Sequence, residues 1–271
     1  MTSPMSAPTS ATTPATGITS ARFAQQNVLV TGGGSGIGQA VAEAFAGEGA
    51  AVVVAGRSAD KLARTVETLT SRGSRALAVR TDITRSDQVA GLVARTVEEL
   101  GSLDIAVNCA GTLAAGGPVS DLDEDEWARL LDVNLTGTML SMRHEIRHMR
   151  RFGRGTIVNI SSTIGAHARF RGTAAYGAGK AALSALTRAA ALDHCQEGIR
   201  INAVSPGPVD TAMSYLPSES RADRDARYAQ QLPAGRVATV TEVAAAVLFL
   251  ASPQAAFCVG TDLVMDGGAA A

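Results

Sequence analysis

Tyr176 and Lys180 are four residues apart, and the chain that follows them is rich in alanine and leucine. On an α-helix, residues i and i+4 lie on the same face, so a phenol and an ammonium would project together. A nearby ammonium stabilises phenolate and lowers the pKa of a tyrosine from about 10. The pair could therefore act as a general acid and base near neutral pH, although a tyrosine and a lysine with this spacing also occur on ordinary exposed helix faces.

The residue type at position 180 is itself informative. Lys180 and Lys61 are the only lysines among the 24 lysines and arginines of the chain. Unlike arginine, lysine has a compact charge and a pKa that responds to its surroundings. A chemical role for Lys180 would account for a lysine here in a chain that otherwise uses arginine for positive charge.

Seven short apolar runs alternate with six longer helix-like segments, which is typical of a parallel sheet covered by helices on both faces. The runs lie at residues 27–31, 51–55, 75–80, 104–108, 155–161, 199–204 and 262–265. The helix-like segments lie at about 36–48, 59–72, 85–100, 123–151, 173–196 and 241–251. We therefore predict a single doubly wound α/β (Rossmann) domain over 23–271 with a seven-stranded parallel sheet. Residues 1–22 are predicted to be a disordered tail, because the first 20 residues carry no charged side chain and consist mainly of Ser, Thr, Ala and Pro.

The segment at about 212–235 interrupts this alternation. It contains Pro217, Pro233 and a polar run at 218–225. It also follows the end of a predicted strand, where ligand crevices form in sheets of this kind. We interpret it as a mobile substrate lid with one or two short helices, and the alternative is a surface insertion without function.

A glycine-rich sequence, Thr-Gly-Gly-Gly-Ser-Gly-Ile-Gly at residues 31–38, connects the first predicted strand to the first predicted helix. Glycines allow a phosphate to approach the backbone closely, and the free N–H groups at a helix start attract the anion. The spacing is T-G-x-x-x-G-x-G rather than the strict G-x-G-x-x-G fingerprint. We expect this segment to bind a nucleotide rather than to be a ligand-free turn, through Gly32, Gly34, Ser35, Gly36, Ile37 and Gly38.

The second predicted strand is followed by Arg57 and Ser58. Sites that select NAD usually have an acidic residue near this position to bind the adenosine ribose hydroxyls. Here the acid is absent, and Arg57 with Ser58 could receive a 2′-phosphate. This favours NADP(H) as the cofactor, with NAD(H) possible if Arg57 is only a solvated loop charge.

Together with Tyr176 and Lys180, these segments resemble the short-chain dehydrogenase/reductase family over residues from about 25 to 268. Asn108-Cys109-Ala110-Gly111 is similar to the family's N-N-A-G element, with Cys109 in place of the second Asn. The resemblance implies four catalytic residues: Asn134, Ser162, Tyr176 and Lys180. It implies cofactor contacts at Asp82 (adenine), Ile83, Asn108, Ala110, Gly111, Tyr176, Lys180, Pro206, Gly207, Val209 and Thr211 (nicotinamide carboxamide).

The serine of this set has two candidates. The family tends to place its serine three residues before a glycine, which selects Ser162, three residues before Gly165. Ser161 is then expected to bond backbone or neighbouring groups.

The resemblance implies an NAD(P)(H)-dependent oxidoreductase that interconverts a ketone and a secondary alcohol. Tyr176 would donate the proton, and Ser162 would hydrogen-bond to the reacting oxygen. Lys180 would bind the nicotinamide ribose and lower the pKa of Tyr176, and Asn134 would hold a water that links Lys180 to solvent. A catalytically silent dinucleotide-binding sensor is the alternative, but such proteins usually lack the tyrosine or the lysine.

The compact length is similar to that of 3-oxoacyl-thioester reductases and secondary-alcohol dehydrogenases. These relatives are commonly homotetramers in which the long helices and the last strand form interfaces. We therefore expect a small-molecule carbonyl or alcohol as the substrate, and a homotetramer or homodimer.

Bulk properties argue against several other classes of protein. The net charge is −1 and the pI is about 6.4, so we expect no nucleic-acid binding, and no apolar run is long enough to span a membrane. The three cysteines are far apart, and His144 and His148 are spaced i, i+4 but with no evident third ligand, so no metal site is expected. A cytoplasmic location is the simplest interpretation.

Overall fold

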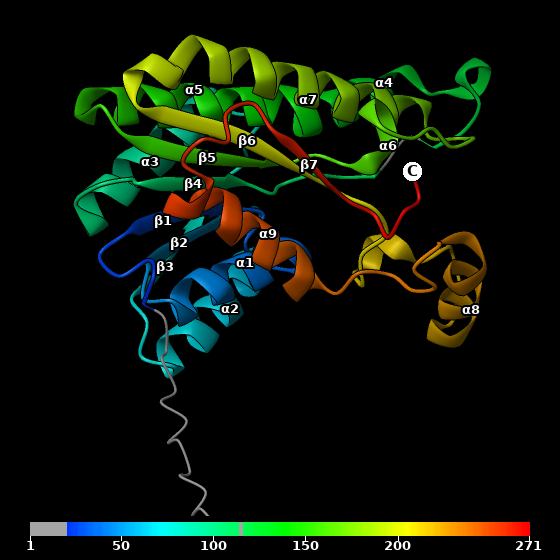
Figure 1. Ribbon diagram of the computed structural model, residues 1–271, viewed down its shortest axis with the longest axis horizontal. Coiled ribbons are helices and arrows are strands. Elements are labelled where there is room, and N and C mark those ends of the chain that lie inside the picture. The colour runs from blue at the N-terminus through cyan, green and yellow to red at the C-terminus, as the bar shows by residue number, and fades with distance from the viewer. Residues whose placement is uncertain (1–20, 114–115) are drawn as a thin grey trace, which may run out of the picture.

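The computed structural model describes residues 21–113 and 116–271, and its centre is a seven-stranded sheet (Figure 1). Every pair of neighbouring strands is parallel, and the strand order is β3-β2-β1-β4-β5-β6-β7. The strands are β1 Asn27–Thr31, β2 Ala51–Gly56, β3 Ala76–Arg80, β4 Ile105–Asn108, β5 Gly155–Ile160, β6 Ile199–Pro206 and β7 Asp262–Met265. The predicted seven-stranded, doubly wound fold is confirmed.

Helices cover both faces of this sheet (Figure 1). One layer contains α1 Gly36–Gly47, α2 Ala59–Ser71 and α9 Val240–Ala251. The other layer contains α3 Ser86–Leu100, α4 Glu124–Leu131, α5 Gly137–Met149 and α7 Ala174–His194. A short helix, α6 Thr163–Ala166, follows β5, and α8 Arg221–Gln231 extends from the body of the domain. Short 3₁₀ turns lie at Val119–Asp121, Arg150–Phe152, Cys195–Glu197, Ala212–Ser214 and Pro253–Ala255.

The strands are apolar throughout because both faces of the sheet are buried. In β1, Val28 and Val30 pack with α1, α2 and α9, whereas Leu29 packs with α3, α5 and α7. This alternation follows from the two-residue period of a strand. Two separate apolar cores result, and they hold the strand ends in a fixed arrangement.

The predicted helix at 123–151 is the main departure from expectation. The structure divides it into α4, a π-helical turn at Asp132–Thr136, and α5. Asn134 lies in this turn, where its side chain accepts a hydrogen bond from Thr112 N at 2.8 Å and donates one to Thr112 O at 2.8 Å. A contact with a segment more than 20 residues away therefore accompanies the change of helix type. Helical periodicity alone could not predict this π-helical turn.

The structure describes only the last two residues of the predicted tail but the whole of the predicted lid segment. Residues 1–20 of the predicted tail lie outside the described residues, while Arg22 forms an ion pair with Glu48 and Phe23 packs edge-on against Phe45. The segment 212–235 contains α8 and one 3₁₀ turn. Its role as a mobile lid stays a prediction.

Candidate active site

The predicted site residues come from one edge of the sheet. Parallel strands all end on the same side, and the candidates follow the carboxyl ends of β1, β2, β3, β4, β5 and β6. The strand order reverses between β1 and β4, which is where such folds open a crevice for a ligand. The topology therefore brings together segments that are up to 180 residues apart in the chain.

The glycine segment after β1 forms a tight turn into α1. Gly32 has φ +69°, and a methyl group at Gly38 would lie 2.3 Å from Gly32 O, so larger residues would displace the turn. Ser35 precedes the helix, is exposed, and makes no side-chain capping bond. The N–H groups at this end of the 12-residue helix therefore have no side-chain cap from Ser35. Nucleotide binding by this segment, residues 31–38 and called the cradle below, stays a prediction.

The cradle is joined to the segment after β4. Thr31 Oγ1 accepts hydrogen bonds from Cys109 N at 3.2 Å and Ala110 N at 3.4 Å. The next residue, Gly111, is exposed, and a methyl group there would lie 3.2 Å from Asn134 Oδ1 and 3.7 Å from Lys180 Nζ. Ala110 and Gly111 therefore connect the cradle to Asn134 and Lys180.

Lys180 is buried, and its ammonium donates a hydrogen bond of 2.8 Å to Ile160 O at the end of β5. Burial lowers the pKa of Lys180 to about 8. Its Nζ lies 5.9 Å from the centre of the Tyr176 ring. The shared helical face inferred from the spacing of Tyr176 and Lys180 is therefore present on α7.

The direction of the Tyr176 pKa differs from the prediction. Burial raises this pKa, and a hydrogen bond with the Ser162 side chain only partly offsets the effect. The predicted lowering by Lys180 is not found, because removal of the phenol from water disfavours phenolate more than its neighbours favour it. The neutral phenol is therefore the stable form across the neutral range.

The two serines after β5 have different surroundings. Ser161 Oγ donates to Lys180 O at 3.2 Å and shares a hydrogen bond of 3.0 Å with Ser184 Oγ, so it binds to α7. Ser162 Oγ accepts a hydrogen bond of 3.1 Å from Ile164 N, which caps α6, and also interacts with Tyr176. Ser162 is thus the serine that lies beside the phenol, and it has the structural role of a cap as well.

Asn134 is fully buried, and both polar atoms of its side chain bond to the backbone of Thr112. These bonds hold the chain that continues from Gly111. A water relay at Asn134 would therefore use its main chain rather than its amide, contrary to the simplest form of the expected role.

At the other end of the crevice, Arg57 and Ser58 are exposed where β2 leads into α2. Arg80 lies beside them at the end of β3, and its Nε donates to Arg57 O at 3.2 Å. Burial tends to raise the pKa of Asp82, but hydrogen bonds from Thr84 and the charges of Arg57 and Arg85 lower it overall. The end of the crevice that would face an adenosine is therefore rich in cations.

The turn after β6 lies next to the glycine segment after β1. Pro206 ends the strand, Gly207 N donates to Met265 O at 2.8 Å, and the backbone of Val209 pairs with Ala238. The methyl group of Thr211 lies 3.3 Å from the position of a Cβ on Gly36. Thr211 is thus brought next to the cradle.

Two predicted cofactor residues have their side chains committed elsewhere. Ile83 is buried in a small cluster with Val89 and Leu140. Asn108 is 3% exposed, and its Nδ2 donates to Glu145 Oε2 at 3.0 Å and to Asn159 Oδ1 at 3.1 Å. Contacts of Ile83 and Asn108 with a cofactor would have to involve the backbone.

Sequence reasoning missed the buried polar residues behind the site. Glu145 is 1% exposed and lies on α5, where the neighbouring basic residues Arg143, His144, Arg147 and His148 suggested an exposed helix face. Arg224 of α8 is also buried and pairs with Asp210 and Asp225 while lying 4.5 Å from the Tyr215 ring centre. Glu145 could have been found from its placement, because it is a charged residue on the core-facing side of a predicted amphipathic helix.

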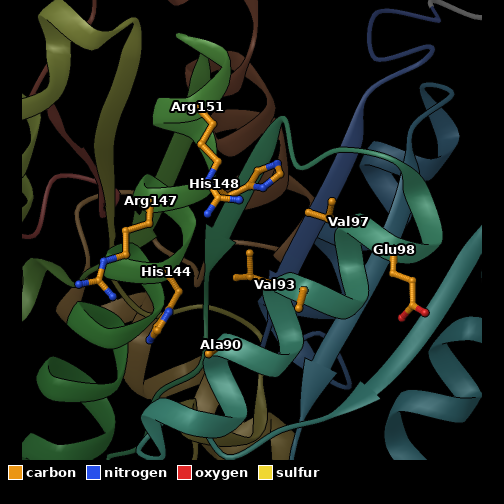
Figure 2. Close-up of a pocket in the computed structure, with 9 residues that line it drawn as sticks. Ala90, Val93, Val97, Glu98, His144, Arg147, His148 and Arg151 are labelled. Atoms are coloured by element: carbon orange, nitrogen blue, oxygen red, sulfur yellow. The ribbon is translucent and has the colours of Figure 1, made fainter.

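The described residues also form a groove and a cavity. A groove of about 510 Å³ runs between α3 and α5, with Val93 and Val97 on one wall and His144, Arg147 and His148 on the other (Figure 2). A cavity of about 680 Å³ borders the loop 168–174. Within the described ranges there is no group of three or more His, Cys, Asp or Glu residues that could hold a metal, and no helix there is long and apolar enough to cross a membrane.

Comparison with known proteins agrees with this geometry. The family model described as enoyl-(acyl carrier protein) reductase matches residues 32–270. The chain is 45% identical to cis-4-hydroxycyclohexanecarboxylate dehydrogenase of Sinomonas cyclohexanicum, over 91% of this chain and 97% of the relative.

Two solved structures have the same fold. A short-chain type dehydrogenase/reductase from Mycobacterium ulcerans has a TM-score of 0.86 at 36% identity, with 91% and 90% of the two chains covered. A short-chain dehydrogenase from Burkholderia cenocepacia J2315, solved in complex with NADP, has a TM-score of 0.84 at 33% identity, with 92% and 100% covered. The chain therefore belongs to the short-chain dehydrogenase/reductase family, whose members named here are dehydrogenases.

Proposed function

We propose that this protein interconverts a ketone and a secondary alcohol with a nicotinamide dinucleotide, and that Tyr176 is its general acid and base. The observation that carries the proposal is the convergence of three side chains beside Gly111. Ser162 follows the end of β5, and Tyr176 and Lys180 lie near the start of α7. A silent sensor is not favoured, because the relatives reported above are named as dehydrogenases.

The residues present fit a dinucleotide. The glycine segment after β1 brings its backbone close to Thr211, and the exposed Ser35 hydroxyl makes no capping bond. Arg57 and Asp82 lie at one end of the crevice, and Lys180 lies at the other. When bound, the nicotinamide supplies or accepts a hydride.

The remaining chemistry belongs to the side chains. Ser162 Oγ accepts from Ile164 N and interacts with Tyr176, so its proton would hydrogen-bond to a substrate oxygen placed between the two hydroxyls. Tyr176, held neutral by burial, donates its proton to the same oxygen as negative charge develops there. Lys180 orients the ribose and provides positive charge beside the phenol.

We further propose that the protein prefers NADP(H), with Arg57 binding the 2′-phosphate. A charge-assisted hydrogen bond contributes about 1.5–3 kcal/mol, so Arg57→Ala should lower kcat/KM for NADPH by about 10- to 100-fold and leave the value for NADH within about twofold. Steady-state kinetics with each nucleotide tests this expectation. Arg72→Ala, at the opposite end of α2, is the control. Wild-type turnover that is much faster with NAD(H) than with NADP(H) would refute the preference.

The substrate is proposed to be a small molecule with a secondary alcohol or ketone on a ring. The support is the name of the relative that acts on cis-4-hydroxycyclohexanecarboxylate. In the lid, Arg221, Arg224 and Arg227 are already paired with carboxylates, whereas Arg169 and Arg171 are exposed beside the loop cavity. Nucleotide absorbance should be followed with cyclic and acyclic alcohols, each with and without a carboxylate. Absence of turnover across ring alcohols and ring ketones with both nucleotides would contradict the proposal.

The assembly is proposed to be a homotetramer that uses β7 in one of its interfaces. β7 is an edge strand. The fully exposed Phe257 precedes it, and Val264 within the strand is 37% exposed. Exposed apolar groups along an open edge favour association with another chain. Phe257→Asp should halve the molar mass measured by size-exclusion chromatography with light scattering. An unchanged mass at every protein concentration would exclude this interface.

A further inference from the structure

A buried polar cluster connects the ends of β4 and β5 to the helices behind them. Asn108 and Asn159 are direct partners across the two strands, and both point toward α5 and α7. Asn159 Nδ2 donates to Thr187 Oγ1 at 2.9 Å and contacts Met142 Sδ at 3.2 Å. Glu145 of α5 completes the cluster by accepting from Asn108 Nδ2.

One acceptor in this cluster has no donor. Among residues 21–113 and 116–271, no hydrogen-bond donor reaches the buried Asn108 Oδ1, while Nδ2 of the same amide donates to both Glu145 and Asn159. An unsatisfied buried carbonyl costs about 1–3 kcal/mol. A carboxylate at Glu145 can only accept, but a carboxylic acid can donate its proton to Oδ1 and accept from Nδ2 at the same time.

The surroundings of Glu145 contain no cation to stabilise a carboxylate. On its own helix, His144 and His148 lie toward the α3 groove (Figure 2), and Arg143 and Arg147 are exposed. The charged residues of α3 are mostly at the surface: Asp87, Arg95, Glu98 and Glu99. On α7, Lys180 donates to Ile160 O, and beyond β4 burial raises the pKa of the Cys109 thiol to about 12. Burial likewise raises the pKa of Glu145 to about 7, with the hydrogen bond from Asn108 acting in the opposite direction.

We propose that Glu145 is a positioning residue that binds Asn108 as a neutral carboxylic acid, and that this pairing holds the ends of β4 and β5 at the spacing the site requires. Asn108 continues into Ala110, whose N–H binds Thr31 Oγ1, and into Gly111, where an added methyl group would lie 3.7 Å from Lys180 Nζ. Asn159 precedes Ile160, whose carbonyl binds the Lys180 ammonium. The effect of this pairing on the active site rests on the proposed function. Glu145 would act on that site through Asn108 and not by contact with the cofactor or the substrate.

Glu145→Gln separates this hypothesis from simple packing. Glutamine presents one donor and one acceptor to Asn108 and does not titrate, so it mimics the acid at every pH. In the wild type, a folded-state pKa raised above the unfolded value of about 4.3 contributes stability that is lost as pH rises through about 7. The difference in melting temperature, Glu145→Gln minus wild type, should therefore increase by ~5 °C when the pH is raised from 5.5 to 8.5. Glu67→Gln, an exposed glutamate on α2, is the control and should show no such gain.

Glu145→Leu tests the positioning role through nucleotide binding. Loss of both hydrogen bonds to Asn108 should weaken NADPH binding about tenfold, measured by nucleotide fluorescence at pH 6, whereas Glu145→Gln should stay within about twofold. Infrared spectra at pH 5.5 should show a carboxylic acid carbonyl band in the wild type that is absent from Glu145→Gln.

A melting-temperature difference that is constant with pH, absence of the infrared band, or equal loss of NADPH binding in the two variants would each overturn the proposal. None of these readouts depends on turnover. Failure of the proposed catalytic function would therefore be distinguishable from failure of this inference.

Discussion

Tyr176→Phe should lower kcat for ketone reduction by about 10²- to 10⁴-fold, the usual contribution of a positioned general acid. Phenylalanine keeps the partly buried ring beside Lys180 but removes the hydroxyl that interacts with Ser162. Because the neutral phenol is the stable form here, the loss should be seen in the reductive direction already at neutral pH. Stopped-flow or steady-state measurement of NADPH oxidation with a ring ketone gives this value.

Two further measurements distinguish a loss of acid catalysis from a loss of folding or of nucleotide binding. The melting temperature of Tyr176→Phe should be within a few degrees of the wild type, and its NADPH dissociation constant within about threefold, since the hydroxyl is the only group removed. Near-normal kcat in this variant would mean that Tyr176 is not the acid. A loss of kcat that is matched by an equal loss of nucleotide binding would instead assign Tyr176 a binding role.

Gly38→Ala is expected to have the second large effect, on nucleotide binding. The added methyl group would lie 2.3 Å from Gly32 O, and the nearby atoms are backbone, which cannot rotate away as a side chain would. The turn must then shift by about an ångström, which typically costs 1–3 kcal/mol and misplaces the N–H groups of the cradle. We expect NADPH affinity to fall by about 10²-fold in a fluorescence titration.

The same helix offers a matched control for that substitution. Gly47 is the last residue of α1, and a methyl group there would meet no atom within 4 Å. Gly47→Ala should therefore bind NADPH normally and unfold at the same temperature or slightly higher, since alanine is favoured over glycine in helices by up to about 1 kcal/mol. Equal binding by Gly38→Ala and Gly47→Ala would show that the cradle does not bind the nucleotide.

Most of the fold could be predicted because the signals are local. Strand β1 has the predicted bounds, since burial on both faces makes a strand apolar throughout, and glycine marks its junction with α1. The division of the predicted 123–151 helix could not be predicted in the same way. The π-helical turn coincides with the hydrogen bonds between Asn134 and Thr112, which exist only after the chain has folded.

The candidate site shows the same division between local and long-range causes. The separation of Tyr176 and Lys180 along α7 is a local property, so their shared face followed from spacing alone. The pKa of Tyr176 depends instead on burial by distant segments, and its predicted direction was wrong. Asn108 was expected to contact the cofactor because its neighbours match a motif, but the position of its side chain facing Glu145 depends on the pleat of β4 and on the packing of α5.

The sequence by itself determined the residue types, their spacing and the order of strands and helices, because these depend on local periodicity and on glycine at a turn. Only the tertiary structure decided which polar groups are removed from water and which partners they meet. Ser162 rather than Ser161 lies beside Tyr176, Lys180 binds Ile160 O, and Glu145 pairs with Asn108. The physical reason is that desolvation and hydrogen bonding act between segments far apart in the chain, so they are established only when the strands align and the two helix layers close over the sheet.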